Sequence, residues 1–228
     1  MEGMFVDERQ LQNAPTFRHV FTPRQYAYFP VKRAIDIVLS LAGLIVLAPV
    51  FVIIAIVIKL DSPGPVFHIV KMRTGKNGKP LSYLKFRSMI KDAEKMQDSL
   101  MPFTEMDGPV FKIANDPRVT KVGRFIRKTS IDELPQLFSV LIGKMSLVGP
   151  RPLSFQEIDG CTDWQRAKRL LVTPGLTCIW QVSGRSSISS FEQRIGMDLD
   201  YVERIGFLTD MMLLLKTVPV VLSGRGAC

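Results

Sequence analysis

The sequence predicts a mainly helical α+β fold in which a small β-hairpin and several short helices accompany one re-entrant membrane helix. Three observations lead to this prediction. The stretch from Ile37 to Ile58 contains no charged residue. Two short segments rich in strand-forming residues flank a turn that contains Asn77 and Gly78. Apolar residues then recur at helical spacing in several later segments.

The apolar stretch is long enough to enter a membrane. As one helix it would measure about 33 Å, against a hydrocarbon core of about 30 Å. Pro49 interrupts it because proline removes a helical hydrogen bond, and basic residues flank both ends, among them Lys32 and Lys59. Since basic flanks favour the cytoplasmic side, we expect the helix to break at Ala48-Pro49 and return to the same face. A kinked spanning helix is the alternative.

Composition changes divide the chain into three parts. Residues 1–31 are polar and aromatic with scattered prolines and predict a loosely ordered or surface-lying arm. Residues 32–62 form the membrane helix-break-helix, and residues 63–228 form one further domain. At the start of this domain, "VFHIV" and "LSYLKF" predict the two strands of the hairpin around "TGKNGKP".

Helices are expected in five places beyond the hairpin. Their predicted ranges are 88–100, 122–128, 132–141, 163–171 and 207–222. In the last of these, Leu208, Met211, Met212 and Leu215 share one face. This face indicates either a core helix or an amphipathic helix at a membrane interface, and we favour the interface.

The bulk composition limits the function classes. The 30 Lys and Arg residues against 21 Asp and Glu give a formal net charge of +9, which favours anionic partners. The 2 histidines make histidine catalysis or a histidine-rich zinc site improbable. The 3 cysteines are scattered without metal-ligand spacing and read as ordinary thiols of a reducing compartment. Carboxylates are therefore left for acid–base or covalent chemistry.

One candidate pair of carboxylates lies in "TSIDELPQ", residues 129–136. Ser130 and Glu133 fit a capping box, in which each side chain bonds a backbone amide at a helix start. The alternative is a reactive carboxylate. Asp132 suits this role, since the free amides of a first helical turn would favour its ionised form. If Glu133 is tied back as a cap, it cannot also be a base or a metal ligand.

Cations on separate loops favour the reactive alternative. Several of them are bracketed by Gly or Pro, which places them on turns rather than on solvated helix faces, as a convergent polyanion site requires. The candidates are Lys85, Arg87, Arg118, Arg127, Arg151 and Arg185. For each one taken singly, an ordinary surface salt bridge is the alternative.

Four motifs carry a resemblance to a known family. They are "KFRSM" (85–89), "NDPRVTKVGRFIRKTSIDELPQLFSVLIGKMSLVGPRP" (115–152), "TPGLTCIWQVSGR" (173–185) and "DLDYVERIGFLTDMMLLLKTVPVVLSGRGA" (198–227). In order and spacing they resemble the bacterial sugar transferases, which are monotopic phosphoglycosyl transferases. The resemblance covers about residues 32–228.

The resemblance implies a compact catalytic domain on the cytoplasmic face of the bacterial inner membrane. Such enzymes transfer a sugar-1-phosphate from a UDP-sugar to undecaprenyl phosphate and release UMP, which initiates exopolysaccharide, capsule or O-antigen synthesis. Carried over to this chain, Asp132 is the covalent nucleophile of an Asp-Glu pair, and the reaction is ping-pong. Mg2+ is the implied cofactor, with Asp132 or Glu133 as its ligand and Asp198 a distant third.

The resemblance also bears on binding residues and partners. Arg127 is our first choice to hold phosphate, ahead of Lys85, Arg87, Arg118, Arg151 and Arg185. The expected partners are the UDP-sugar, undecaprenyl phosphate and membrane lipid, and a homodimer is left open. The sugar is expected to be glucose or galactose, with an N-acetylated or dideoxy hexosamine as the alternative.

Some residues depart from the family pattern. Ala48 replaces a frequent Ser before the breaking proline, and Cys178 and Cys228 replace a usual Gly and Tyr. The segment "HIVKMRTG" is one residue longer than the family pattern, which leaves His68 to Met72 without a clear alignment. The chain lacks the upstream membrane helices of larger members and is expected to be a minimal catalytic unit with a short arm.

Rival readings remain. A basic, membrane-tethered nucleic-acid binder would interleave aromatic and basic residues, whereas here the cations surround an acidic pair, so we expect no nucleic-acid partner. A catalytically silent scaffold is disfavoured by the intact acidic pair. An enzyme that transfers the sugar without its phosphate would release UDP instead of UMP.

Overall fold

A computed structural model describes residues 21–104, 113 and 115–224. Within these residues the protein is mainly helical, with two small two-stranded sheets, and the predicted hairpin is confirmed. Most of the predicted N-terminal arm and Cys228 lie outside the described residues. The α-helices and strands in chain order are α2 (Pro23–Asp61), β1 (Phe67–Thr74), β2 (Pro80–Phe86), α3 (Gln97–Leu100), α4 (Lys121–Lys128), α5 (Gln136–Leu141), β3 (Ser146–Val148), α6 (Phe155–Asp159), α7 (Asp163–Arg169), β4 (Gly175–Thr177), α8 (Ile179–Ser183), α9 (Phe191–Arg204) and α10 (Phe207–Ser223).

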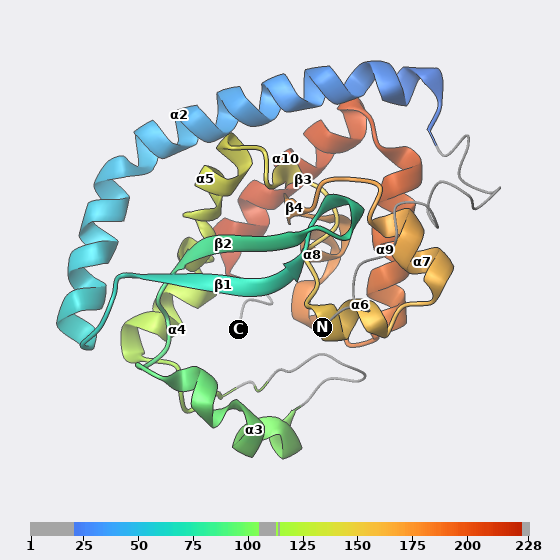
Figure 1. Cartoon of the computed structure of the whole chain (residues 1–228). Helices are drawn as coiled ribbons and strands as arrows, with labels where there is room; N and C mark the ends of the chain where they lie inside the picture. Colours follow the sequence, from blue (N-terminus) through green and yellow to red (C-terminus); the bar gives the residue numbers. More distant parts are fainter. Residues whose placement is uncertain (1–20, 105–112, 114, 225–228) are drawn as a thin grey trace.

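The long helix α2 arches over the rest of the chain (Figure 1). It begins earlier than the expected start of the membrane element, because Thr22 and Gln25 form a capping box and Pro23 occupies the first turn. The predicted break at Ala48-Pro49 is not present, since α2 continues through Pro49 as one helix. Proline in a helix removes one hydrogen bond, and here the neighbouring turns hold the helix together.

Polar residues of α2 face the protein. Tyr28, Lys32, Asp36 and Ser40 recur every fourth residue and are buried, whereas many apolar residues of the same helix are exposed. Lys32 Nζ donates to Asp210 Oδ2 (2.6 Å) and to the Val148 carbonyl (2.8 Å). This arrangement is the reverse of a soluble core helix and fixes the orientation of α2 on the domain.

A second set of bonds fixes the same helix. Asp36 Oδ1 accepts from the Leu147 amide (2.9 Å), and the Arg33 guanidinium donates to the carbonyls of Val140 and Leu141 (both 2.7 Å) at the end of α5. Arg33 thus adds a charged donor to two carbonyls at the C-terminal end of the short helix α5.

Strands β1 and β2 pair in antiparallel register, with Phe67 opposite Phe86. At their turn, Asn77 (φ 57°) and Gly78 (φ 73°) have left-handed backbone conformations, as the Asn-Gly signal predicts. The register shifts between Val70 and Arg73, and Met72 has φ 59°. The extra residue of "HIVKMRTG" is therefore accommodated as a β-bulge.

Strands β3 and β4 form a parallel pair that the sequence analysis missed, because each has only 3 residues. A Cβ at Gly175 would lie 2.1 Å from the Gly149 nitrogen, so the two chains approach each other only through glycine. This contact places the loop after β3, with Arg151, against the start of β4.

The helix predictions have mixed outcomes. α4, α7 and α10 match their predicted segments. The helix predicted over 88–100 is wrong in its first part, because Met89 pairs with Val119 in an isolated bridge and helical turns begin only at Ala93. α6, α8 and α9 were not predicted. On α10, Leu208 and Leu215 are exposed, which is the arrangement expected of the interfacial alternative.

Candidate active site

The acidic pair lies on a short 3-10 turn, Ile131–Glu133, that directly follows α4. The capping box predicted for Ser130 and Glu133 is wrong, because Ser130 has φ 57° and makes no side-chain cap. The helix predicted over 132–141 is divided, and α5 begins only at Gln136. Glu133 is consequently free to turn toward other side chains.

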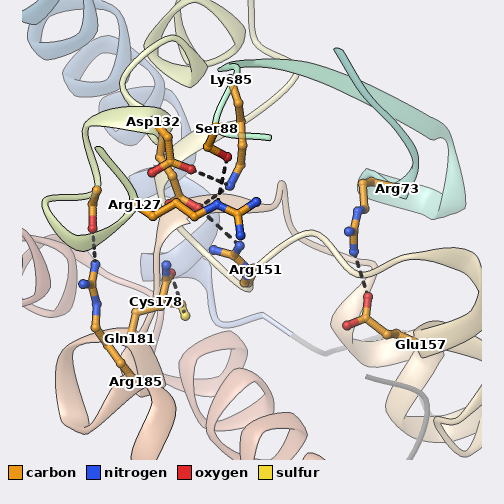
Figure 2. Close-up of polar contacts among 12 residues, drawn as sticks. Arg73, Lys85, Ser88, Arg127, Asp132, Arg151, Glu157, Cys178, Gln181 and Arg185 are labelled. Carbon is orange, nitrogen blue, oxygen red and sulfur yellow. Dashed lines mark hydrogen bonds and ion pairs between the residues drawn. The ribbon is translucent and has the colours of Figure 1, made fainter. Parts of the chain in front are cut away.

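Two cations hold the acidic pair. Lys85 Nζ, from the end of β2, donates to Glu133 Oε1 (2.7 Å) and lies 3.5 Å from Asp132 Oδ2. Arg151 Nη2, from the loop after β3, donates to the same Glu133 oxygen (3.2 Å). Figure 2 shows the side chains of Lys85 and Arg151 directed toward the acidic turn from different elements. The predicted convergence of these two cations on the pair is observed.

Arg127 comes from the last turn of α4, and its Nε donates to Ser88 Oγ (2.8 Å). Its guanidinium lies beside the acidic turn in Figure 2. Burial lowers the pKa of Arg127, and the charge of Asp132 acts in the opposite direction. The sequence analysis did not identify Ser88, because nothing in the motif "KFRSM" indicates which residue its hydroxyl contacts.

The two carboxyl groups have pKa values shifted in opposite directions. Burial raises the pKa of Asp132, although Lys85 and Arg127 partly offset this effect. Burial also acts to raise the pKa of Glu133, but Lys85 and Arg151 outweigh it and hold that pKa well below its ordinary value. The sequence analysis expected helix amides to favour ionised Asp132; here the neighbouring cations do so, against burial.

Arg87 does not reach the acidic pair. Its guanidinium donates to the carbonyls of Pro63 (2.5 Å), Ser62 (2.6 Å) and Ile58 (3.4 Å) at the end of α2. A Cβ at Gly64 (φ +129°) would lie 1.9 Å from Arg87 Nη1, so this packing requires glycine there. The geometry ties the end of α2 to β2, and the phosphate-binding role predicted for Arg87 finds no support in it.

We therefore expect Arg87→Ala to destabilise the fold by about 2–4 kcal/mol, because buried carbonyls lose a charged donor. Arg87→Lys should recover little, since an ammonium group cannot bridge these carbonyls as the guanidinium does. Denaturant unfolding in detergent, with the exposed Arg24→Ala as control, measures the effect. If Arg87→Ala has normal stability but binds the donor more weakly, the result supports the predicted phosphate-binding role of Arg87 instead.

Arg118 is likewise engaged elsewhere. Its Nε and Nη2 bind both carboxylate oxygens of Asp116, with Nη2 to Oδ2 at 2.6 Å, and its Nη1 donates to the Ala93 carbonyl (3.2 Å). Both side chains are buried. This forked ion pair organises the chain before α4.

Arg185 lies beside the acidic turn without touching the carboxylates in any described contact. Its Nη2 donates to Ser130 Oγ (2.9 Å). Asp198, a distant candidate for metal binding, is buried and accepts from Arg169 Nε (2.9 Å). Arg169 also donates to the Arg151 carbonyl, so this buried pair supports the loop that carries Arg151. The sequence analysis missed Arg169, because its value depends entirely on tertiary contacts.

The described residues contain no cluster of three or more His, Cys, Asp or Glu side chains suited to hold a metal ion. The acidic pair alone supplies two carboxylates. A Mg2+ ion that completes its shell with water and substrate phosphates needs only one or two protein carboxylates, so the donor set fits this restricted mode.

Comparisons with known proteins agree with the motifs. A family model described as bacterial sugar transferase matches residues 27–224. The chain is 40% identical over 203 residues to the "Galactosyl transferase CpsE" of Streptococcus agalactiae, covering 89% of this chain and 44% of that protein. It is 41% identical over 202 residues to the "Undecaprenyl-phosphate galactose phosphotransferase" of Salmonella typhimurium, covering 86% and 41%.

The chain thus spans less than half the length of these relatives. A shorter relative, the "Exopolysaccharide production protein ExoY" of Rhizobium meliloti, is 36% identical over 203 residues, with 86% of this chain and 87% of that protein covered. Because the family model matches most of the chain and the identities exceed 30%, this chain belongs to the bacterial sugar transferase family.

Proposed function

We propose that this protein transfers a sugar-1-phosphate from a UDP-sugar to undecaprenyl phosphate at the cytoplasmic face of the bacterial inner membrane. The observation that carries the proposal is the buried Asp132, which lies beside Glu133 among cations from three separate elements. A diphosphate needs such convergent positive charge, and a covalent route needs an ionised nucleophile.

In the proposed first step, an Asp132 oxygen attacks the β-phosphorus of the donor, and the bond from that phosphorus to the bridging oxygen of UMP breaks. In the second step, a phosphate oxygen of the lipid attacks the same phosphorus and the aspartyl bond breaks, which regenerates Asp132. Lys85 favours the ionised form of Asp132 and directs its carboxylate, while Arg127 is available to meet phosphate oxygens.

Glu133 has a different role in this proposal. Because Lys85 and Arg151 both bind Glu133 Oε1, this carboxylate holds the two cations in place between substrate phosphates and nucleophile. Its low pKa means that it stays ionised throughout the working pH range, so it is unsuited to act as a general acid.

Mg2+ is the cofactor that we propose on the basis of the family. Asp132 or Glu133 would hold it, through an oxygen that Lys85 and Arg151 do not occupy. When bound, Mg2+ neutralises diphosphate charge. We do not place Mg2+ on Asp198, because this residue is buried on α9 and accepts from Arg169 Nε instead of contacting the acidic pair in the described contacts.

The shape of α2 supports a re-entrant membrane segment. It is the single helix in the described part of the chain that is long and apolar enough to cross a membrane. Its exposed residues include Ile45 and Val46, near the middle of the arch. Both halves of α2 contact the same domain, through Lys32 near one end and through Ile58 near the other. One domain cannot lie on both membrane faces, which favours entry and exit on one side.

This topology predicts the labelling pattern of two introduced cysteines. Arg24→Cys and Leu60→Cys, at exposed positions near the two ends of α2, should both react with an impermeant maleimide from the cytoplasmic side. Inverted and right-side-out vesicles, with Cys228→Ala as the background, provide the measurement. Labelling of the two cysteines from opposite sides would establish a spanning helix instead.

The activity is tested with membranes, undecaprenyl phosphate and a panel of UDP-sugars. Release of UMP and formation of a lipid-linked sugar diphosphate are expected, and release of UDP would refute sugar-phosphate transfer. The names of the two galactose-specific relatives support galactose as the first donor to test, with glucose second and N-acetylated or dideoxy hexosamines as alternatives. The name of the exopolysaccharide relative supports a role in exopolysaccharide synthesis.

A further inference from the structure

We propose that Ser130 and Arg185 are positioning residues, whose hydrogen bond holds the turn that presents Asp132 to the donor. This inference rests on the proposed function, since it assigns a cause to the orientation of the nucleophile. The bond joins Arg185 Nη2 to Ser130 Oγ at 2.9 Å and links residues 55 positions apart in sequence.

The backbone at Ser130 is the first reason. After α4, Thr129 keeps a right-handed conformation and Ser130 changes to φ 57°, ψ 15°. A left-handed residue just beyond a helix end is usually glycine, because a Cβ atom is unfavourable there. The Glu133 amide then donates to the Ser130 carbonyl (3.1 Å), so this unfavourable residue begins the acidic turn itself.

The backbone at Arg185 is the second reason. Arg185 also has a left-handed conformation, with φ 49°, and its buried Nη1 has no hydrogen-bond partner in the described part of the chain. Both ends of one side-chain bond are therefore held in unfavourable conformations. Such strain, when it occurs at a bond that adjoins the reactive turn, indicates a constraint imposed by function.

In this proposal, the bond between Arg185 and Ser130 sets the orientation of Asp132. Asp132 follows Ser130 by two residues, and its carboxylate must face both Lys85 and the donor phosphorus. Without the bond, Ser130 can relax toward the right-handed conformation of α4 and rotate Asp132 out of line. Arg185 would then act through Ser130, and its loss should reduce the rate of the covalent step with little effect on donor binding.

The test measures initial rates of UMP release by the full chain in vesicles that contain undecaprenyl phosphate, with UDP-galactose or whichever UDP-sugar the panel identifies as the varied donor. Ser130→Ala and Arg185→Ala should each lower kcat roughly 10–100-fold with an unchanged KM, since small displacements of a reacting group have effects of this size. Because both variants remove the same bond, the double variant should be no slower than the slower single variant. Thr129→Ala is the matched control, because its hydroxyl bonds only carbonyls of α4.

The outcomes separate the two proposals. If the wild-type protein releases no UMP from any donor, the proposed function fails. If the wild type is active but the two single losses multiply, or KM rises instead of kcat falling, the positioning role is overturned. Should Ser130→Ala fail to fold, Arg185→Ala carries the test, because it removes the same bond and leaves Ser130 in place. Wild-type rates in Arg185→Ala would overturn the proposal.

Discussion

Asp132→Asn should abolish sugar-phosphate transfer, with a loss of roughly 10⁴-fold or more, because the amide cannot form the bond to phosphorus. The variant should nevertheless fold. Burial raises the pKa of Asp132, so the folded state favours the protonated form, and the ionised carboxylate at neutral pH opposes folding. A neutral Asn removes this opposition, and its thermal midpoint near pH 7 should equal or exceed that of the wild type.

The measurement pairs activity with a covalent trap. Rapid quenching with donor labelled in the β-phosphate should place label on the wild-type polypeptide and none on Asp132→Asn. Glu133→Gln provides the comparison. It should retain some label, because Asp132 is still present. Normal turnover by Asp132→Asn, or turnover by the wild type without any trapped label, would contradict the role of Asp132.

The second large effect is expected for Lys85→Met. Lys85 is the one described side chain that contacts both carboxylates, so its loss leaves Glu133 with Arg151 alone and Asp132 without its nearest cation. Removing one partner of a buried ion pair typically costs about 3–5 kcal/mol. We expect a comparable loss of stability and a fall in kcat of roughly 100-fold or more, because less Asp132 is ionised and donor phosphates lose a cation.

The direction of the pH effect expected for Lys85→Met follows from the pKa of Asp132. Lys85 lowers the pKa of Asp132 against the raising effect of burial, so removal of Lys85 should raise that pKa further. The acidic limb of the kcat/KM profile, already expected above the ordinary value of 3.8 for an aspartate, should move to higher pH in Lys85→Met. Lys79→Met, an exposed lysine of the same hairpin, is the control. An unchanged limb would mean that Lys85 does not set the ionisation of Asp132.

Ionisation of Glu133 should affect the stability of the fold in the opposite direction from ionisation of Asp132. Its folded-state pKa is depressed by Lys85 and Arg151 acting against burial, so it contributes stability above its unfolded pKa. That contribution is lost as the pH falls through the depressed folded value. The acidic pair therefore combines Glu133, whose ionised form stabilises the fold, with Asp132, whose ionised form opposes folding and serves the chemistry in our proposal.

The sequence predicted those parts of the site that depend on residue type and on the local order of residues. Asp132 and Glu133 stand together in a motif, and Lys85 and Arg151 come from separate segments of the chain, the end of β2 and the loop after β3. The hairpin followed from the Asn77-Gly78 signal, because a left-handed turn has few alternatives in sequence. For Arg87 the sequence could not name the partner, since this residue type suits phosphate and carbonyl oxygens equally well.

What the sequence by itself determined is the family, the mainly helical class and the identity of the acidic pair, because these depend on local patterns and on motifs in a fixed order. The tertiary structure alone decided that α2 runs unbroken through Pro49, that Arg87 binds carbonyls at the end of α2, that Arg118 pairs with Asp116, and that Ser130 meets Arg185. The physical reason is that the partner of a charged or hydroxyl side chain is chosen by long-range packing. A hydrogen bond between residues 130 and 185 leaves no signal within either segment.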